Sequence, residues 1–221
     1  MSFLEEMVSV VKAHGAINND FLSRFARGCI SGKEFERFAV EFYHFSRHFP
    51  LVLCHLLINT SDEDEAANLT KILVSELGDG NSKKRHELLY RDFLRSLNIE
   101  PRDIICKPML NTTRDWIETQ LGLYSGKDHF AGLGASFGLE NMAIPMWDQL
   151  IPGLKKYKEK WFHNMDLTYF TFHRELEDQH EDMMRNTLSI YEGNVLIQES
   201  FKNGIKRVLD DEEKFWLGLK C

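Results

Sequence analysis

The segment "FERFAVEFYHF", residues 35–45, shows the periodicity that decides the fold. Its apolar residues recur every three or four positions, which is the spacing of one face of an α-helix. The N-terminal segment "FLEEMVSVV", residues 3–11, has the same spacing. Strict alternation of apolar and polar residues over the length of a strand is hard to find in this chain. The pattern therefore predicts an all-α protein.

The same periodicity, with the positions of glycine and proline, divides the chain into helical stretches. Pro152 is expected to open a new helix, because a proline removes a helical hydrogen bond, and a bend is expected near Pro50. The chain of 221 residues shows neither an internal repeat nor a low-complexity linker, so a single helical domain over 1–221 is expected. About seven or eight helices are expected from stretches near 2–13, 18–28, 32–58, 62–77, 82–97, 108–124, 127–150, 153–162, 166–191 and 194–217, some of which can merge into one helix.

The composition excludes several classes of protein. The net charge of -7 argues against nucleic acid and an anionic membrane surface as partners. No apolar run approaches the roughly 18–20 residues that span a bilayer. The N-terminus lacks the basic region of a signal peptide. The four cysteines are widely scattered, without the spacing of a zinc or redox motif, so we expect reduced thiols and a cytoplasmic protein.

The segment "FHRELEDQHEDMM", residues 172–184, contains candidate metal ligands. His173, Glu177 and His180 fall within an arc of roughly 60° on a helix, so their side chains share one face. Two imidazoles and a carboxylate form a partial coordination set for a divalent metal. The alternative is a charged helix face turned to solvent. The apolar flanks oppose it, because buried histidines and carboxylates need partners.

Glu140 is a carboxylate in an apolar helix. It follows the uncharged stretch 130–139, which is rich in small residues that allow close helix packing. A buried glutamate is rare unless it is paired. The alternative is a surface glutamate near the proline at position 145.

Glu76 and His86 flank the break "GDG", residues 78–80. A second helix is expected to restart at Asn81 or Ser82, with His86 one turn inside it. A Gly-x-Gly break lets two helices re-aim, so Glu76 and His86 can converge although they are ten residues apart. The full candidate set has three carboxylates and three histidines, which would nearly neutralise two divalent ions in a buried site. Its members are Glu76, His86, Glu140, His173, Glu177 and His180.

The order of these motifs resembles the haem-oxygenase-like di-iron oxidase family. The matching elements are "ELGDG" at 76–80, then His86, then Glu140 in its small-residue helix, then the His-x3-Glu-x2-His pattern of 173–180. The resemblance covers roughly residues 20–215. Relatives include the chlamydial death-domain-associating protein, and the thiamin-salvage hydrolases and pyrroloquinoline-quinone synthase share the fold.

This resemblance implies a seven-helix haem-oxygenase-like bundle that holds two Fe ions on the six candidate ligands. It implies a non-haem di-iron oxidase or oxygenase that uses O2 and an external reductant to oxidise a small organic substrate. Fatty acids, amines and amino-acid derivatives are the substrate classes. Mixed histidine and carboxylate ligands favour Fe or Mn, and Zn is the other candidate. Glu177 stands where the family more often has aspartate.

Two positions separate this chain from particular relatives. The chlamydial group is thought to make p-aminobenzoate from its own tyrosine, which precedes the glutamate ligand, and Leu139 stands at that position here. The thiamin-salvage hydrolases carry a nucleophilic cysteine where "IPMW" places Met146. A thioether cannot act as that nucleophile, so a hydrolase of this type is disfavoured.

Three other functions remain open from the sequence. One is a metal-free or vestigial helical protein that binds a partner, and another is a hydrolytic zinc enzyme. The third is a ferritin-like carboxylate protein, which would use Glu41 and His44 together with Glu177 and His180.

Further candidates concern substrate and assembly. Phe42 and Phe45 are candidate substrate contacts, and Arg174 is a candidate anchor for a substrate carboxylate. The C-terminal helix with Trp216 either packs across a homodimer interface or caps the bundle.

Overall fold

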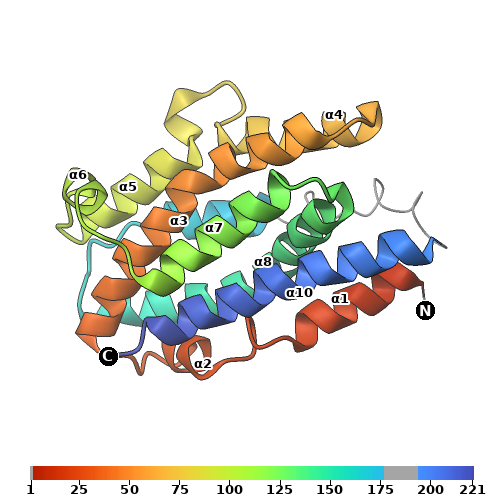
Figure 1. The fold of residues 1–221 in the computed structure, drawn as a ribbon. Helices are drawn as coiled ribbons and strands as arrows, with labels where there is room; N and C mark the ends of the chain where they lie inside the picture. The colour runs from red at the N-terminus through yellow and green to blue at the C-terminus, as the bar shows by residue number, and fades with distance from the viewer. Residues whose placement is uncertain (1, 177–193) are drawn as a thin grey trace.

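The computed structural model describes residues 2–176 and 194–221, and these residues form helices and connections without a strand (Figure 1). The all-α prediction is confirmed. In the described ranges, no helix is both long enough and apolar enough to cross a bilayer. Residues 168–176 are helical. The other elements are α1 (Phe3–Ala13), α2 (Asp20–Ala26), α3 (Gly32–Asn59), α4 (Glu63–Glu76), the 3-10 turn η1 (Ser82–Lys84), α5 (His86–Ser96), α6 (Pro101–Ile105), α7 (Asn111–Tyr124), α8 (His129–Lys160) and α10 (Val195–Gly218).

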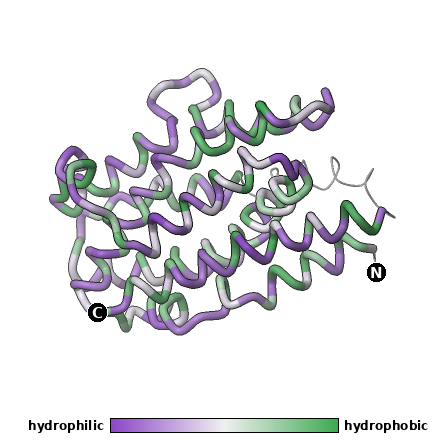
Figure 2. The backbone as a smooth tube through the Cα atoms, viewed as in Figure 1, coloured by the Kyte–Doolittle hydropathy of each residue, from purple (hydrophilic) through white to green (hydrophobic). Residues whose placement is uncertain are grey.

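The long helices α3, α7, α8 and α10 form the body of the bundle. α10 lies between α7 and α1 and crosses α8, while α3 packs against α4, α5 and α7 (Figure 1). Hydrophobic and hydrophilic residues are interspersed along the helices, as expected where one face of a helix lies in the core and the other faces solvent (Figure 2). The two termini lie at opposite ends of the bundle (Figure 1).

The prediction that Pro152 opens a new helix is wrong, because α8 continues through it. Leu150 and Leu154, on either side of Pro152, are both fully buried in the same core. The packing of these side chains outweighs the hydrogen bond that the proline removes. α3 likewise continues through Pro50.

Seven helices is also too low a count for the described part of the chain. The additional elements include the short helix α6, Pro101–Ile105, which no periodic pattern in the sequence predicts. Pro101 occupies the first turn of α6, where its missing N–H costs nothing. A helix of five residues is too short to show an apolar repeat.

Close contact between α8 and α10 depends on two glycines. A Cβ atom added at Gly134 would clash with the carbonyl of Phe201, and one added at Gly204 would clash with the carbonyl of Ala131. The small residues noted in the sequence therefore let α10 approach the N-terminal half of α8. This contact holds the helix that carries Glu140.

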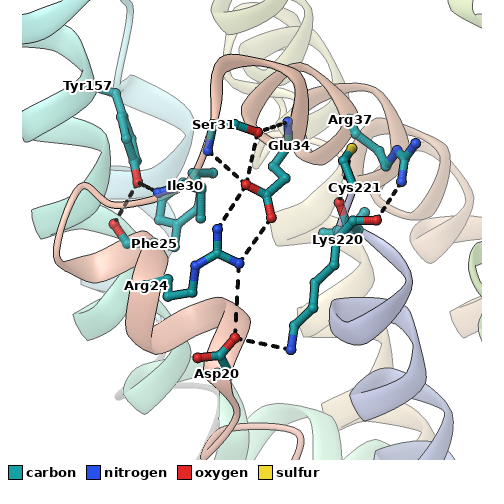
Figure 3. A network of polar contacts seen from close by, with 11 residues as sticks. Asp20, Arg24, Phe25, Ile30, Ser31, Glu34, Arg37, Tyr157, Lys220 and Cys221 are labelled. Atoms are coloured by element: carbon teal, nitrogen blue, oxygen red, sulfur yellow. Dashed lines mark hydrogen bonds and ion pairs between the residues drawn. The ribbon is translucent and has the colours of Figure 1, made fainter.

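A buried carboxylate, Glu34, joins α2 to the start of α3 (Figure 3). Both Nη atoms of Arg24 donate to its two oxygens at 3.0 Å. The Ser31 backbone N–H donates to Glu34 Oε2 at 2.7 Å, and Glu34 N donates to the Ser31 hydroxyl at 3.2 Å, which completes a capping box. Arg37 donates to the Lys220 carbonyl at 2.8 Å, so the C-terminus is held against α3.

Glu34→Gln is expected to lower the free energy of unfolding by about 1–3 kcal/mol at neutral pH, because it removes a charged acceptor from the Arg24 fork. Burial opposes the charged form, yet the hydrogen bonds from Ser31 and Arg24 prevail and lower the pKa of Glu34. A lowered pKa stabilises the fold above the ordinary carboxyl range, and this stabilisation is lost as the pH falls through the folded-state pKa.

Urea unfolding at pH 7 and at pH 3 checks this prediction, with the exposed Glu36→Gln as a control on the same helix. The deficit of Glu34→Gln should shrink at pH 3. An equal deficit at both pH values would contradict the assigned ion pair.

Candidate metal centre

Three of the candidate ligands meet inside the bundle. Glu76 is the last residue of α4, His86 is the first residue of α5, and His173 lies in the helical residues 168–176. All three side chains are buried, and one ligand atom from each lies within 4.8 Å of the other two. Glu76 Oε2 is 2.9 Å from His86 Nδ1, and Glu76 Oε1 is 4.0 Å from His173 Nε2.

The loop between α4 and α5 brings Glu76 and His86 together. Gly78, Asp79 and Gly80 have φ angles of 94°, 51° and 78°. A Cβ atom at Gly78 would also clash with the carbonyl of Asn81, so glycine is required there. These residues, with left-handed backbone conformations, reverse the direction of the chain. Glu76 and His86 therefore converge, as predicted from the Gly-x-Gly break.

The expected start of the second helix was wrong. Asn81 caps the 3-10 turn η1, where its side chain accepts a hydrogen bond from Lys83 N at 3.0 Å, and α5 begins only at His86. Because the intervening residues form a separate turn, His86 lies at the N-terminus of α5 rather than one turn inside the helix.

The orientation of His173 is fixed by its own helix. His173 Nδ1 lies 2.8 Å from the carbonyl of Tyr169, which can only accept, so Nδ1 carries the proton. In the neutral imidazole Nε2 is then the unprotonated nitrogen, and this atom faces Glu76. Histidine ligands in metalloproteins are commonly oriented by such a bond to a carbonyl.

Two nitrogens of His86 have no hydrogen-bond partner in the described residues, although both are buried. Nδ1 lies 2.9 Å from Glu76 Oε2, a distance that makes an ion pair if the ring is protonated. Unpartnered buried nitrogens are costly, and coordination to a metal would satisfy one of them.

The donor set fits a divalent transition metal. Histidine and carboxylate ligands lie about 2.0–2.2 Å from a bound ion, so two donors of the same ion lie about 3–4 Å apart, the larger value applying to opposite donors. The three donor atoms within 4.8 Å of one another are therefore close to the required spacing. Two nitrogens and a carboxylate oxygen suit Fe, Mn or Zn.

Glu140 lines a cavity together with Glu76 and His173. Its side chain is buried, as the apolar stretch before it predicts. Glu140 does not belong to the three-residue cluster itself. Glu177 and His180, the other two candidate ligands, lie outside the described residues.

The cavity has a volume of about 70 Å³ and is largely apolar. This volume is several times the roughly 10–15 Å³ that one water molecule needs. Phe42 and Phe45, the candidate substrate contacts, line it. Arg174 is not among the lining residues, and its Nε donates to Asp148 Oδ1 at 2.8 Å. Aromatic residues form much of the wall: Phe42, Phe45, Phe49, Trp116, Trp147 and Tyr169.

Several cavity residues were missed from the sequence, Trp116, Trp147 and Tyr169 among them. Tyr169 and Trp147 both pack against His173, with ring centroids 4.1 and 5.4 Å away. The one available signal was sequence proximity, because Trp147 follows Met146 and Tyr169 lies one helical turn before His173.

Glu41 and His44 are the pair that a ferritin-like site requires, and both lie outside the cluster of Glu76, His86 and His173. Glu41 Oε2 accepts hydrogen bonds from Leu110 N at 3.0 Å and from Thr113 Oγ1 at 2.5 Å, at the start of α7. His44 is buried, and burial lowers its pKa to about 4. Neither residue belongs to the Glu76, His86 and His173 cluster.

Met146, which the resemblance in sequence places where the thiamin-salvage hydrolases carry a cysteine, lines the cavity. Of the four cysteines, all in the described residues, none lines this cavity. The cavity therefore presents a thioether and no thiol.

Trp216 is fully buried within its own chain. Its ring stacks on Phe21 and Phe38, with centroids 5.9 and 6.3 Å apart. Trp216 therefore packs inside the bundle of its own chain, which is one of the two roles expected for the C-terminal helix.

A profile of the iron-containing redox enzyme family matches residues 36–209. The chain belongs to this family.

Two curated relatives are similar over most of their length. The 4-chloro-allylglycine synthase of Streptantibioticus cattleyicolor is 23% identical over 219 residues, covering 99% of this chain and 82% of the relative. The 4-aminobenzoate synthase of Chlamydia pneumoniae is 22% identical over 209 residues, covering 95% and 91%.

Solved structures confirm the haem-oxygenase-like fold. A protein of unknown function from Nostoc punctiforme, described as CADD-like, superposes with a TM-score of 0.78 at 17% identity and covers 98% of this chain and 95% of its own. A domain from Shewanella denitrificans with a haem-oxygenase-like fold superposes with a TM-score of 0.76 at 15% identity and covers 97% and 89%.

Proposed function

We propose that this protein is a non-haem di-iron oxidase or oxygenase that uses O2 to oxidise a small organic substrate. The observation that carries the proposal is the buried meeting of Glu76, His86 and His173 beside an apolar cavity, in an iron-containing redox enzyme. We assign Glu140, Glu177 and His180 as the remaining ligands. An external reductant completes the reaction, and a cytoplasmic location and a homodimer stay expectations.

Two iron ions would supply the electrons and the coordination positions with which O2 is activated. The protein residues hold and shield this chemistry. Tyr169 fixes the ring of His173 through its carbonyl, so that Nε2 is available as a ligand. The aromatic walls limit access of water, which strengthens electrostatic interactions inside the cavity.

Leu139 supports an external substrate. It lines the cavity, next to Glu140 in the sequence, at the position of the tyrosine that the chlamydial relatives are thought to consume. A leucine side chain offers no phenol for that reaction. The substrate is therefore proposed to be a separate small molecule, as the name of the 4-chloro-allylglycine synthase relative also indicates.

Anaerobic loading with Fe(II), followed by metal analysis and stopped-flow mixing with O2, tests the proposal. We expect about two Fe ions per chain, as for a bundle site with mixed carboxylate and histidine ligands, and a transient visible absorption band after O2 is added. Absence of bound iron would instead favour the metal-free partner-binding alternative. Binding of Zn alone, with no reaction with O2, would favour a hydrolytic enzyme.

A further inference from the structure

The cavity beside the candidate ligands is lined mainly by residues of two helices, α3 and α8. Its lining residues on α3 run from Phe42 to Phe49, which corresponds to about 10 Å of helix. On α8 they run from Leu139 to Trp147, or about 12 Å. Phe42 is 1% exposed, whereas Phe49 is only partly buried, so the cavity has a deep end and a shallower end.

Among the residues that the structure describes, only the metal-site residues bring a charge to the cavity wall. Besides Glu76, Glu140 and His173, the described lining consists of aromatic rings, aliphatic side chains and methionine thioethers. Ser46 adds a neutral hydroxyl. Among the described residues, no lysine or arginine lines the cavity. In the metal-free protein, a substrate anion would find no cationic partner among the described lining residues, and the two carboxylates would repel it.

We infer that the substrate places an uncharged, extended alkyl chain in this cavity, along α3 and past the candidate ligands. This inference rests on the proposed function for its reaction, but the binding it describes does not need the metal. Apolar surface gains free energy when it leaves water, whereas a charged group buried without a partner loses it. An alkyl chain can fill an apolar cavity of this kind favourably, whereas a zwitterionic head group would be buried there without partners for its charges.

Ala143 sets the room available for the chain. It is the smallest side chain of the cavity wall and lies on α8 between Glu140 and Met146. A larger residue at this position would occupy the space beside the candidate ligands, so Ala143 is assigned as a residue that determines substrate size.

Binding of straight-chain alcohols to the metal-free protein tests the inference. Trp116 and Trp147 line the cavity, so tryptophan fluorescence reports occupancy, and calorimetry gives the dissociation constants. From n-butanol to n-octanol, each methylene is expected to raise the affinity by about fourfold. Octanoate and the amino acid norleucine are expected to bind at least about tenfold more weakly than n-octanol.

The matched variants are Ala143→Phe, in the cavity, and Ala67→Phe, on the exposed surface of α4. Ala143→Phe should weaken n-octanol binding by at least about tenfold, because it removes most of the space available to the chain. Ala67→Phe should leave the binding unchanged. Circular dichroism establishes that both variants are folded, and if Ala143→Phe is not, the ranking of ligands on the native protein still decides.

Equal or tighter binding of octanoate or norleucine would overturn the inference, because it would show a charged head group recognised inside the cavity. Absence of a chain-length dependence would overturn it too. The iron-loading experiment fails or succeeds independently. Tight n-octanol binding without iron binding would refute the di-iron function and keep the apolar cavity, and the reverse result would refute only the substrate class.

Discussion

His173→Ala is expected to abolish stoichiometric iron binding and the absorbance change on O2 addition. The substitution removes the only described ligand outside the 76–86 segment that belongs to the three-residue cluster. Mutations of residues that merely orient a ligand already cost about 10–100-fold in metal affinity, so loss of the ligand itself should cost at least about a hundredfold. Metal analysis after anaerobic Fe(II) loading and desalting measures the effect.

Two histidine controls make this result specific. His163 is exposed and outside the cluster, so His163→Ala should retain full iron content. His44→Ala tests the ferritin-like alternative, which requires His44 as a ligand. Iron loss in His44→Ala together with full iron content in His173→Ala would reverse the proposed ligand assignment.

Glu212→Gln is expected to stabilise the protein increasingly as the pH rises. Glu212 is fully buried in α10, and burial raises the pKa of its carboxyl well above the ordinary value, with the nearby Trp216 indole opposing this only in part. Neither carboxyl oxygen makes a hydrogen bond of normal geometry within the described residues. Between the ordinary carboxyl pKa and the raised pKa of the folded state, the folded protein therefore favours protonated Glu212, while the unfolded chain ionises it.

The direction of the pH dependence follows from this proton. Between the ordinary carboxyl pKa and the raised folded-state pKa, the folded protein binds more protons than the unfolded chain. Its stability therefore falls as the pH rises, by up to about 1.4 kcal/mol per pH unit for one group. Below the ordinary carboxyl pKa this loss is absent. Glutamine has the same shape and no such dependence.

Urea unfolding from pH 4 to pH 8 measures the difference between the two proteins. The gap in unfolding free energy should widen with pH for Glu212→Gln and remain constant for Glu199→Gln, an exposed residue of the same helix. A constant gap for Glu212→Gln would show that Glu212 is ionised in the folded state.

The sequence predicts the helices where an apolar face repeats and fails where packing overrides local preference. The periodic residues 35–45 lie within α3 as expected. Pro152 was misread because the burial of Leu150 and Leu154, which holds α8 together, depends on neighbours far along the chain. α6 was missed because it is shorter than the pattern that would reveal it.

The features of the candidate site also differ in whether they depend on local sequence or on tertiary packing. The convergence of Glu76 and His86 depends on local loop chemistry, and the glycines reveal it. The cavity depends on which faces of α3, α7 and α8 oppose one another, so Trp116 gave no signal of its role. Arg174 is a candidate anchor because a guanidinium can pair with a carboxylate, and its ion pair with Asp148 depends on tertiary placement that the sequence does not show.

The cluster also ties metal binding to the completion of folding. Glu76 and His86 are joined by a short loop, whose closure costs little entropy, so a nascent α4–α5 hairpin presents both donors early. His173 follows α6, α7 and α8 in the sequence, so its place beside Glu76 and His86 depends on the tertiary fold. A chain that stops before residue 173 holds two of the three donors, and full occupancy by metal therefore reports a native tertiary structure rather than a local motif.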